Sequence, residues 1–326
     1  MAQRKQGERE FIAGIRRGAR GAASNRGVRL GIGDDCAVLR VGRGQELVVT
    51  TDLTLEGRHF KREWHPARAV GHRVLARGLS DLAAMGARPV AAFLSLALPA
   101  KLAGGAWIQG FLDGLLALAK DAGVELAGGD LSESPRGAGV MADIVCVGKV
   151  KTGKALLRSG ARAGDAIYVT GALGGAAVFV RDERARTTAK HRENDPHLWP
   201  KPRLGVGVLL VKRGLATGCI DVSDGVSVDL AHLCEESGCG AVVESARIPV
   251  HPLASARKDG LELALHGGED YELLFTARAG TKVPRSIGGV KVTRIGRMVR
   301  GKGVKIVGED GRVRPLKAGG WEHFSR

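Results

Sequence analysis

Hydrophobic positions recur along the chain at two spacings, and the two spacings alternate. Intervals of three and four residues, typical of amphipathic helices, alternate with short runs rich in valine and leucine, typical of strands. Helices are expected over 66–85, 107–122, 173–180 and 204–215, and one more just after Asp224. Strands are expected over 47–53, 90–98, 124–127, 140–147, 165–169, 217–222, 241–244, 271–276 and 291–295. Because both halves alternate in this way, the pattern predicts a mixed α/β protein with two lobes.

A chain of 326 residues exceeds most single hydrophobic cores, so about two domains are expected. The Gly/Lys-rich segment 148–154 reads as a turn that divides a domain at 28–150 from a domain at 151–326. Residues 1–27 are basic, and we expect a partly mobile arm with one short amphipathic helix. Residues 181–203 are charged and contain proline, which favours a loop.

The formal net charge of +16 is compatible with more than one kind of binding partner. It is compatible with attraction to polyanions such as nucleic acid, with steering of small anionic substrates, or with an arginine-rich solvated surface. The basic residues are dispersed, and aromatic residues make up only 4% of the chain, so platforms for stacking single-stranded bases are not expected.

The cysteines and the hydrophobic runs indicate where in the cell the protein is located. The five cysteines are odd in number and form no CxxC pair, which disfavours disulfide frameworks and zinc ribbons and favours a reducing cytoplasm. The first residues lack the apolar core of a signal peptide. The longest uncharged apolar run, 89–100, is too short to span a bilayer, so no membrane partner is expected.

Acidic residues lie repeatedly beside glycines or at the ends of expected elements. Taken singly, an aspartate in such a place is usually a cap or a turn former. Asp81 differs, because a carboxylate on an Ala/Leu-rich helix face is costly to bury unless it is paired or metal-bound. Hard oxygen ligands next to flexible glycines are what Mg²⁺ shared between carboxylates and phosphates requires. The set comprises Asp34, Asp35, Asp52, Asp81, Asp130, Asp221, Asp224, Glu269 and Asp270.

Other catalytic motifs are weak or missing. Segment 148–154, GKVKTGK, fits GxxxxGK, but Ala155 stands where a phosphate loop needs a hydroxyl, so a turn is the better interpretation. Cys36 follows two aspartates, which would raise its thiol pKa, so it reads as a small buried residue. No GxSxG or HExxH occurs. The lack of a nucleophile fits direct phosphoryl transfer, in which positioning and charge neutralisation do most of the work.

Eight motifs occur in the order seen in thiamine-monophosphate kinases, which the chain resembles from about residue 31 to the C-terminal GGWEHF. They are GIGDDCAVL, TTDLTLEGRHF, LSDLAAMGARP, GGDLSES, LRSGARAGD, YVTGALGG, DVSDGVSVDLAHL and GGEDYELLFT. The resemblance implies a two-lobed, ATP-binding fold like that of aminoimidazole ribonucleotide synthetase. Its N-terminal lobe would form a β-barrel with a second copy in a homodimer, and its C-terminal lobe would be an α/β sandwich. The implied reaction converts ATP and thiamine monophosphate to ADP and thiamine diphosphate with several Mg²⁺ ions.

The resemblance also assigns roles to residues. The implied magnesium ligands are Asp35, Thr50, Thr51, Asp52, Asp81, Asp130, Asp221 and Asp224. The implied ATP contacts are Gly129, Asp130, Arg158 and Ser223. The implied thiamine-phosphate contacts are His59, Glu269 and Trp321. Catalysis is expected through metal held by Asp52, Asp81 and Asp224. The chain departs from the usual family pattern at Gly78, Leu131 and Arg58.

Two alternatives stand beside this interpretation. One is a sister ATP enzyme of the same fold, of the aminoimidazole ribonucleotide or selenophosphate synthetase type. The selenophosphate type is disfavoured because no reactive cysteine precedes the first motif. The aminoimidazole ribonucleotide type is disfavoured because the GRHF and GGEDYELLFT segments are like those of thiamine-monophosphate kinases. The other is a non-catalytic basic protein that binds nucleic acid, which predicts steeply salt-dependent affinity and no ATP turnover.

Overall fold

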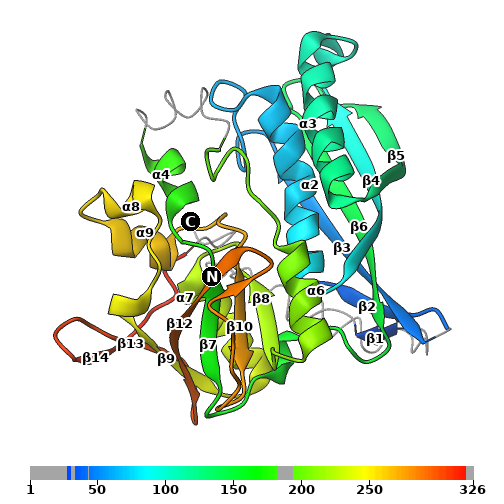
Figure 1. Cartoon of the computed structure of the whole chain (residues 1–326). Helices are drawn as coiled ribbons and strands as arrows, with labels where there is room; N and C mark the ends of the chain where they lie inside the picture. Colours follow the sequence, from blue (N-terminus) through cyan, green and yellow to red (C-terminus); the bar gives the residue numbers. More distant parts are fainter. Residues whose placement is uncertain (1–27, 31–33, 43, 183–193, 321–326) are drawn as a thin grey trace, which may run out of the picture.

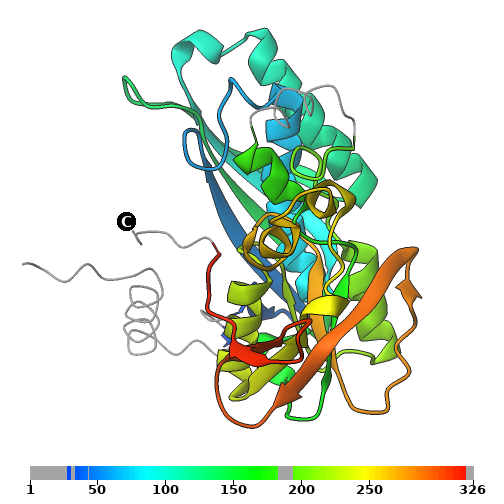
Figure 2. The ribbon, with the colours of Figure 1, turned by 90° about the vertical axis from the view of Figure 1, so that its left-hand side faces the viewer.

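The computed structural model describes residues 28–30, 34–42, 44–182 and 194–320 (Figure 1). The basic arm expected at 1–27 lies outside these residues, as do residues 183–193 of the charged loop expected over 181–203. The described chain forms two lobes, each built on one β-sheet. In Figure 2 the teal helix α3 and the red strands β13 and β14 lie at opposite ends of the molecule.

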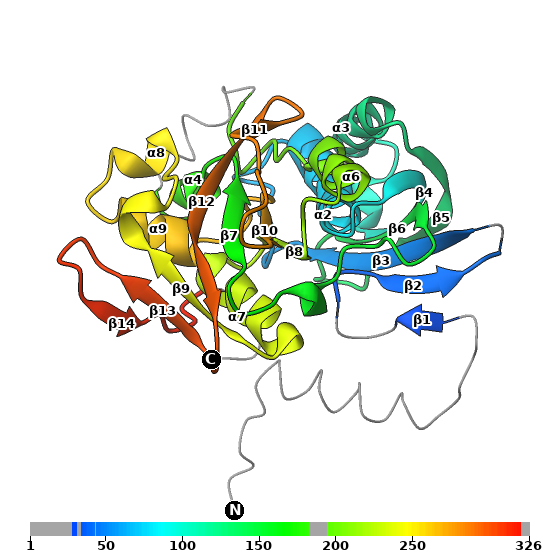
Figure 3. The ribbon, with the colours of Figure 1, turned by 60° about the horizontal axis from the view of Figure 1, so that its bottom comes forward.

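The N-terminal lobe is a six-stranded sheet in the order β1-β2-β3-β6-β4-β5. Neighbouring strands are antiparallel except β4 and β5, which are parallel. Helices α2 and α3 cover one face of it (Figure 3). The strands are β1 (Val28–Leu30), β2 (Ala37–Arg40), β3 (Gln45–Leu55), β4 (Arg88–Leu98), β5 (Glu125–Glu133) and β6 (Met141–Lys151). The helices are α2 (Ala67–Ala84) and α3 (Ala106–Ala122).

Helix α2 is the central element of the molecule. Of its 18 residues 13 are buried, because the sheet, α3 and parts of the C-terminal lobe surround it. Gly71 and Gly114 allow α2 and α3 to touch backbone to backbone, since a Cβ at either position would lie 1.8 Å from a carbonyl oxygen of the other helix. A charged side chain on the buried face of α2 therefore has to find its partner inside the protein.

The C-terminal lobe is an eight-stranded sheet in the order β14-β13-β9-β12-β7-β10-β8, with β11 paired to β12. Helix α6 packs with α2 and joins the lobes through a shared apolar cluster (Figure 1). The strands are β7 (Ala166–Thr170), β8 (Gly218–Asp221), β9 (Gly240–Glu244), β10 (Leu273–Ala277), β11 (Ser286–Ile287), β12 (Val290–Val299), β13 (Val304–Val307) and β14 (Val313–Pro315). The helices are α4 (Gly175–Arg181), α6 (Leu204–Arg213), α7 (Val226–Ser237), α8 (Pro252–Ser255) and α9 (Gly260–His266).

Most expected helices and strands are present, within a few residues at their ends. Helix α3 ends at Gly123, whose φ of 64° is the left-handed conformation that favours glycine. Two expectations were wrong in part. Strand β6 continues to Lys151, so only the end of segment 148–154 is a turn. Strand β5 runs through Asp130, beyond the expected end of this strand at residue 127. Strands β1, β2, β11, β13 and β14 and helices α8 and α9 were missed because they are too short to show a period.

The N-terminal sheet of the described chain is open, and a closed barrel is not formed within it. Among the described helices, none is long and apolar enough to cross a membrane.

Candidate active site between the two lobes

Three carboxylates from distant parts of the sequence meet where the lobes join. Asp35 precedes β2, Asp81 lies in α2 and Asp221 ends β8, and one oxygen of each lies within 4.8 Å of the others. Burial and mutual repulsion raise the pKa of Asp81 and Asp221 well above the usual range. A bound divalent cation would relieve that repulsion, and three carboxylates are the donors that Mg²⁺ prefers. The cluster therefore suits the metal that the sequence predicts.

Short hydrogen bonds hold two of these carboxylates in place. The Thr50 hydroxyl donates to Asp81 Oδ2 at 2.5 Å, and the Ser80 hydroxyl donates to Asp221 Oδ2 at 2.6 Å. The second contact joins α2 of the N-terminal lobe to β8 of the C-terminal lobe. Each carboxylate keeps lone pairs for a metal ion, because an ionised carboxylate accepts at about four positions.

Arg158 reaches the cluster through Asp35. Its Nε and Nη2 each lie 3.0 Å from one oxygen of that carboxylate, and its backbone N–H donates to Asp34 Oδ2 at 3.0 Å. Burial and the adjacent Asp35 raise the pKa of Asp34 to about 7. Arg158 thus brings positive charge to the carboxylate cluster.

A second ion pair lies beside the cluster. Arg77 of α2 binds Asp52 of β3 bidentately, with Nε 2.9 Å from Oδ2 and Nη2 2.7 Å from Oδ1. Asp52 lies on the same face of β3 as Thr50, because side chains alternate along a strand. Asp52 and Asp81 therefore both face the interior from the N-terminal lobe.

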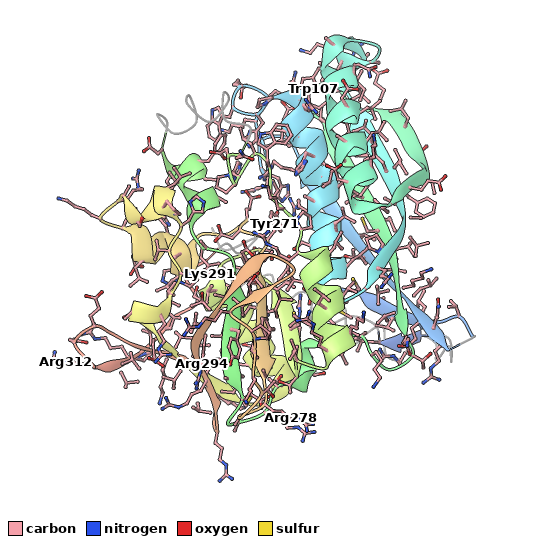
Figure 4. The ribbon with its side chains drawn as sticks, viewed as in Figure 1. Trp107, Tyr271, Arg278, Lys291, Arg294 and Arg312 are labelled. Atoms are coloured by element: carbon pink, nitrogen blue, oxygen red, sulfur yellow. The ribbon has the colours of Figure 1, made fainter. Side chains whose placement is uncertain are left out.

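A cavity of about 500 Å³ opens between the lobes above these groups. Figure 4 shows Tyr271, one of its lining residues, where the two lobes meet. The N-terminal lobe contributes Asp52, residues 57–61, Trp64, His65, Arg77 and Asp81. The C-terminal lobe contributes Ala177, residues 179–181, His197, Asp221, Ser223, Asp224, residues 266–269, Tyr271, Gly319 and Gly320. The cavity thus exposes carboxylates at one part and aromatic and imidazole rings at another.

Glu269 is held in a strained backbone at this cavity. It has a φ of 67° and Tyr271 a φ of 50°, which non-glycine residues rarely adopt. Its carboxylate lies 2.7 Å from Arg73 Nη2 and 2.9 Å from His197 Nδ1. Burial acts to raise the pKa of Glu269, but Arg73 and His197 outweigh it and hold that pKa well below the usual range. Glu269 is therefore ionised and fixed.

A buried histidine pair extends this contact. His65 Nε2 lies 2.9 Å from His197 Nε2, and the Lys61 N–H donates to His65 Nδ1 at 3.2 Å. Since the ionised Glu269 only accepts, a proton on His197 Nδ1 would face that carboxylate, and His197 Nε2 would then accept from His65 Nε2–H. Both rings are then neutral with one proton each. Burial and the nearby Arg73 agree with this, since they lower the pKa of His65 to about 3.

Asp229 is a further residue that the sequence patterns did not identify. Its Oδ2 accepts the backbone N–H groups of Ser223, Asp224 and Gly225 at 3.1, 3.1 and 3.0 Å. The turn that presents Ser223 and Asp224 to the cavity is thus tied to the first turns of α7. The available signal was an aspartate in the buried stripe of a helix, as at Asp81. Arg77, His65 and His197 carried no signal of their own.

The structure brings most of the expected site residues together and separates others. Thr51 lies on the opposite face of β3 from Thr50, and Gly129 and Asp130 lie in the edge strand β5. One row of paired positions crosses the sheet from β3 to β5 through Leu53, Asp143, Ser95 and Asp130. Asp130 is therefore three strand spacings, roughly 14 Å, from β3. Trp321 lies outside the described residues. The residues at the cavity or its carboxylate cluster are Asp35, Thr50, Asp52, His59, Asp81, Arg158, Asp221, Ser223, Asp224 and Glu269.

Known proteins share both the sequence and this architecture. Residues 33–150 match the family described as AIR synthase related protein, N-terminal domain, and residues 162–309 match its C-terminal domain. The thiamine-monophosphate kinase of Escherichia coli is 38% identical over 311 residues, covering 91% of this chain and 93% of that protein. That of Rhodopirellula baltica is 35% identical, with 90% and 89% covered.

Solved structures agree. A crystal structure of thiamine-monophosphate kinase from Stenotrophomonas maltophilia has a TM-score of 0.73 at 35% identity and covers 95% of this chain and 97% of that one. The structure described as AaThiL complexed with AMPPCP and TMP has a TM-score of 0.82 at 29% identity and covers 99% of both chains. With these matches along nearly its full length, the chain belongs to the family of thiamine-monophosphate kinases.

Proposed function

We propose that this protein transfers the γ-phosphoryl group of ATP to thiamine monophosphate, producing ADP and thiamine diphosphate. The observation that carries the proposal is the cluster of Asp35, Asp81 and Asp221 beside a cavity lined by both lobes. Relatives that share this architecture are named thiamine-monophosphate kinases, and one was solved with AMPPCP and TMP.

The reaction needs little covalent help from the protein. An oxygen of the acceptor phosphate bonds to the γ-phosphorus, and the bond from that phosphorus to the bridging oxygen breaks as ADP leaves. The acceptor is already ionised near neutral pH, so no strong general base is required. Repulsion between two polyanions is the main barrier, and Mg²⁺ held by the aspartates would supply the neutralising charge.

The chain's own residues divide this task. We assign metal binding to Asp35, Asp52, Asp81, Asp221 and Asp224 with the Thr50 hydroxyl. Arg158 and Ser223 are assigned to ATP, and His59, Glu269 and Trp321 to thiamine monophosphate. Both carboxylate oxygens of Glu269 already have protein partners, so its effect on the thiazolium cation would be electrostatic. In this scheme residues 28–150 bind metal and ATP and form the dimer, and residues 151–326 complete the ATP and substrate site.

We further propose a homodimer, which would place Thr51, Gly129 and Asp130 against a second copy of the chain. The face of the N-terminal sheet away from α2 exposes Leu53 and Phe93, which are 50% and 38% accessible, in the same rows as Thr51 and Asp130. A second copy closing a barrel over this face would bury these side chains and bring Asp130 toward the partner's sheet. Sedimentation velocity tests this: the wild-type protein should be dimeric, and Phe93→Asp should be monomeric. A monomeric wild-type protein would rule the dimer out.

We also propose that the enzyme works in the cytoplasm. All five cysteines are free and buried, which supports the reducing cytoplasm as its location.

The decisive experiment supplies Mg²⁺-ATP with thiamine monophosphate and detects thiamine diphosphate and ADP. Substrates of the sister synthetases are run in parallel. ADP release and thiamine diphosphate formation only with thiamine monophosphate supports the proposal. ADP release with a sister enzyme's substrate instead, or no turnover with any of them, overturns it.

A further inference from the structure

Helix α2 carries a row of three charged side chains, of which Arg77 and Asp81 line the cavity. Arg73, Arg77 and Asp81 are four residues apart, so they lie on one face of the helix. Arg73 binds Glu269 at one end of the row, and Asp81 joins the carboxylate cluster at the other. Arg77 is therefore placed between the residues assigned to thiamine and those assigned to the metal.

The guanidinium of Arg77 is only partly used. Nε and Nη2 bind Asp52, as described above, and the side chain is 16% exposed. Its Nη1 is buried and has no hydrogen-bond partner among the described residues. A buried donor left unpaired costs free energy, so native proteins almost always supply an acceptor. Because Arg77 lines the cavity, that acceptor is expected on a bound ligand.

The chemistry of the position selects the acceptor. Although burial acts to lower it, Tyr271, Asp52 and Glu269 raise the pKa of Arg77, so the guanidinium stays charged. A planar guanidinium matches the geometry of phosphate oxygens, and the hydrogen bond to a charged oxygen is about twice as strong as a neutral one. A thiamine monophosphate molecule that reached from Glu269 toward Asp81 would carry its phosphate past this point.

We propose that Arg77 binds the phosphate of thiamine monophosphate through Nη1 while Nε and Nη2 keep Asp52 in place. The inference rests on the proposed function. It adds a substrate contact on α2 that none of the eight motifs contains, since Arg77 lies just outside LSDLAAMGARP. The same side chain would align the acceptor and hold one carboxylate of the metal site.

The test compares the binding of thiamine monophosphate and of unphosphorylated thiamine by calorimetry. The full-length protein is used with Mg²⁺ and a non-hydrolysable ATP analogue. Arg77→Gln should lower the affinity for thiamine monophosphate about ten- to hundredfold and leave the affinity for thiamine unchanged. Arg77→Lys keeps the positive charge but not the planar guanidinium, so its loss of affinity for thiamine monophosphate should be smaller. Arg297→Gln, an exposed arginine on β12, should change neither affinity.

The outcomes separate the two proposals. Equal weakening of both ligands, or no weakening of either, in folded Arg77→Gln would show that Arg77 only holds Asp52. If Arg77→Gln does not fold, the same comparison is made with Arg77→Lys, whose loss must again be confined to the phosphorylated ligand. Failure of the wild-type protein to form thiamine diphosphate would instead overturn the proposed function.

Discussion

Ser80 donates its hydroxyl proton to Asp221 across the boundary between the lobes, at 2.6 Å. Both side chains are buried, Ser80 in α2 and Asp221 at the end of β8. A single hydrogen bond thus couples the packing of the lobes to the geometry of the carboxylate cluster.

Ser80→Ala is expected to lower the free energy of unfolding by about 1–3 kcal/mol, because a buried carboxylate loses its donor. Urea denaturation measures the loss. Ser286→Ala, an exposed serine on β11, serves as the control and should change stability by less than about 0.5 kcal/mol. Equal effects of the two substitutions would mean that the interlobe bond contributes nothing.

Asp81→Asn should stabilise the metal-free protein and abolish turnover. Removing one charge from three crowded carboxylates relieves their repulsion, which we expect to add roughly 1–2 kcal/mol in the presence of a chelator. Thermal unfolding should also lose its Mg²⁺-dependent shift, which reflects binding to the folded state. Asp121→Asn, exposed at the end of α3, should behave as wild type. A full Mg²⁺ shift in Asp81→Asn would contradict the metal assignment.

Gly129→Ala should be among the most damaging glycine substitutions. Gly129 has a φ of 149°, and a Cβ there would lie 1.8 Å from the Leu94 carbonyl oxygen, so β5 must move away from β4. We expect a loss of about 3 kcal/mol. Gly137 also has a positive φ, 82°, but open space around it, and Gly137→Ala should cost only about 1 kcal/mol. Thermal unfolding of the two variants separates steric overlap from backbone strain, and similar losses would refute the close approach.

The His65–His197 pair should make stability depend on pH. His65 has a pKa of about 3 in the folded protein and about 6.5 when unfolded, so below pH 6.5 the unfolded chain binds more protons. Its contribution to stability is therefore lost as the pH falls. Between pH 7 and pH 5 the stability advantage of wild type over His65→Leu should shrink by roughly 2 kcal/mol. Denaturation at both pH values measures it, and a constant difference would show that His65 is not held neutral.

Local sequence patterns alone predicted the helices and strands whose hydrophobic spacing continues over several turns or strand positions. The apolar intervals of α2 and α3 gave both helices nearly to the residue, because a helix face is defined by residues three and four apart. The motifs identified the family and the aspartates. Both signals are local, so neighbouring residues are enough to carry them.

Which of these residues meet depends on how distant segments pack in the folded protein. Asp35, Asp81 and Asp221 come together because β2, α2 and β8 pack at the interlobe boundary, a relation between segments far apart in the chain. Strand alternation turned Thr51 away from Thr50, and strand order placed Asp130 at an edge. Arg77 meets Asp52 in the same way, because Asp52 is 25 residues away, on a strand that only folding brings against α2.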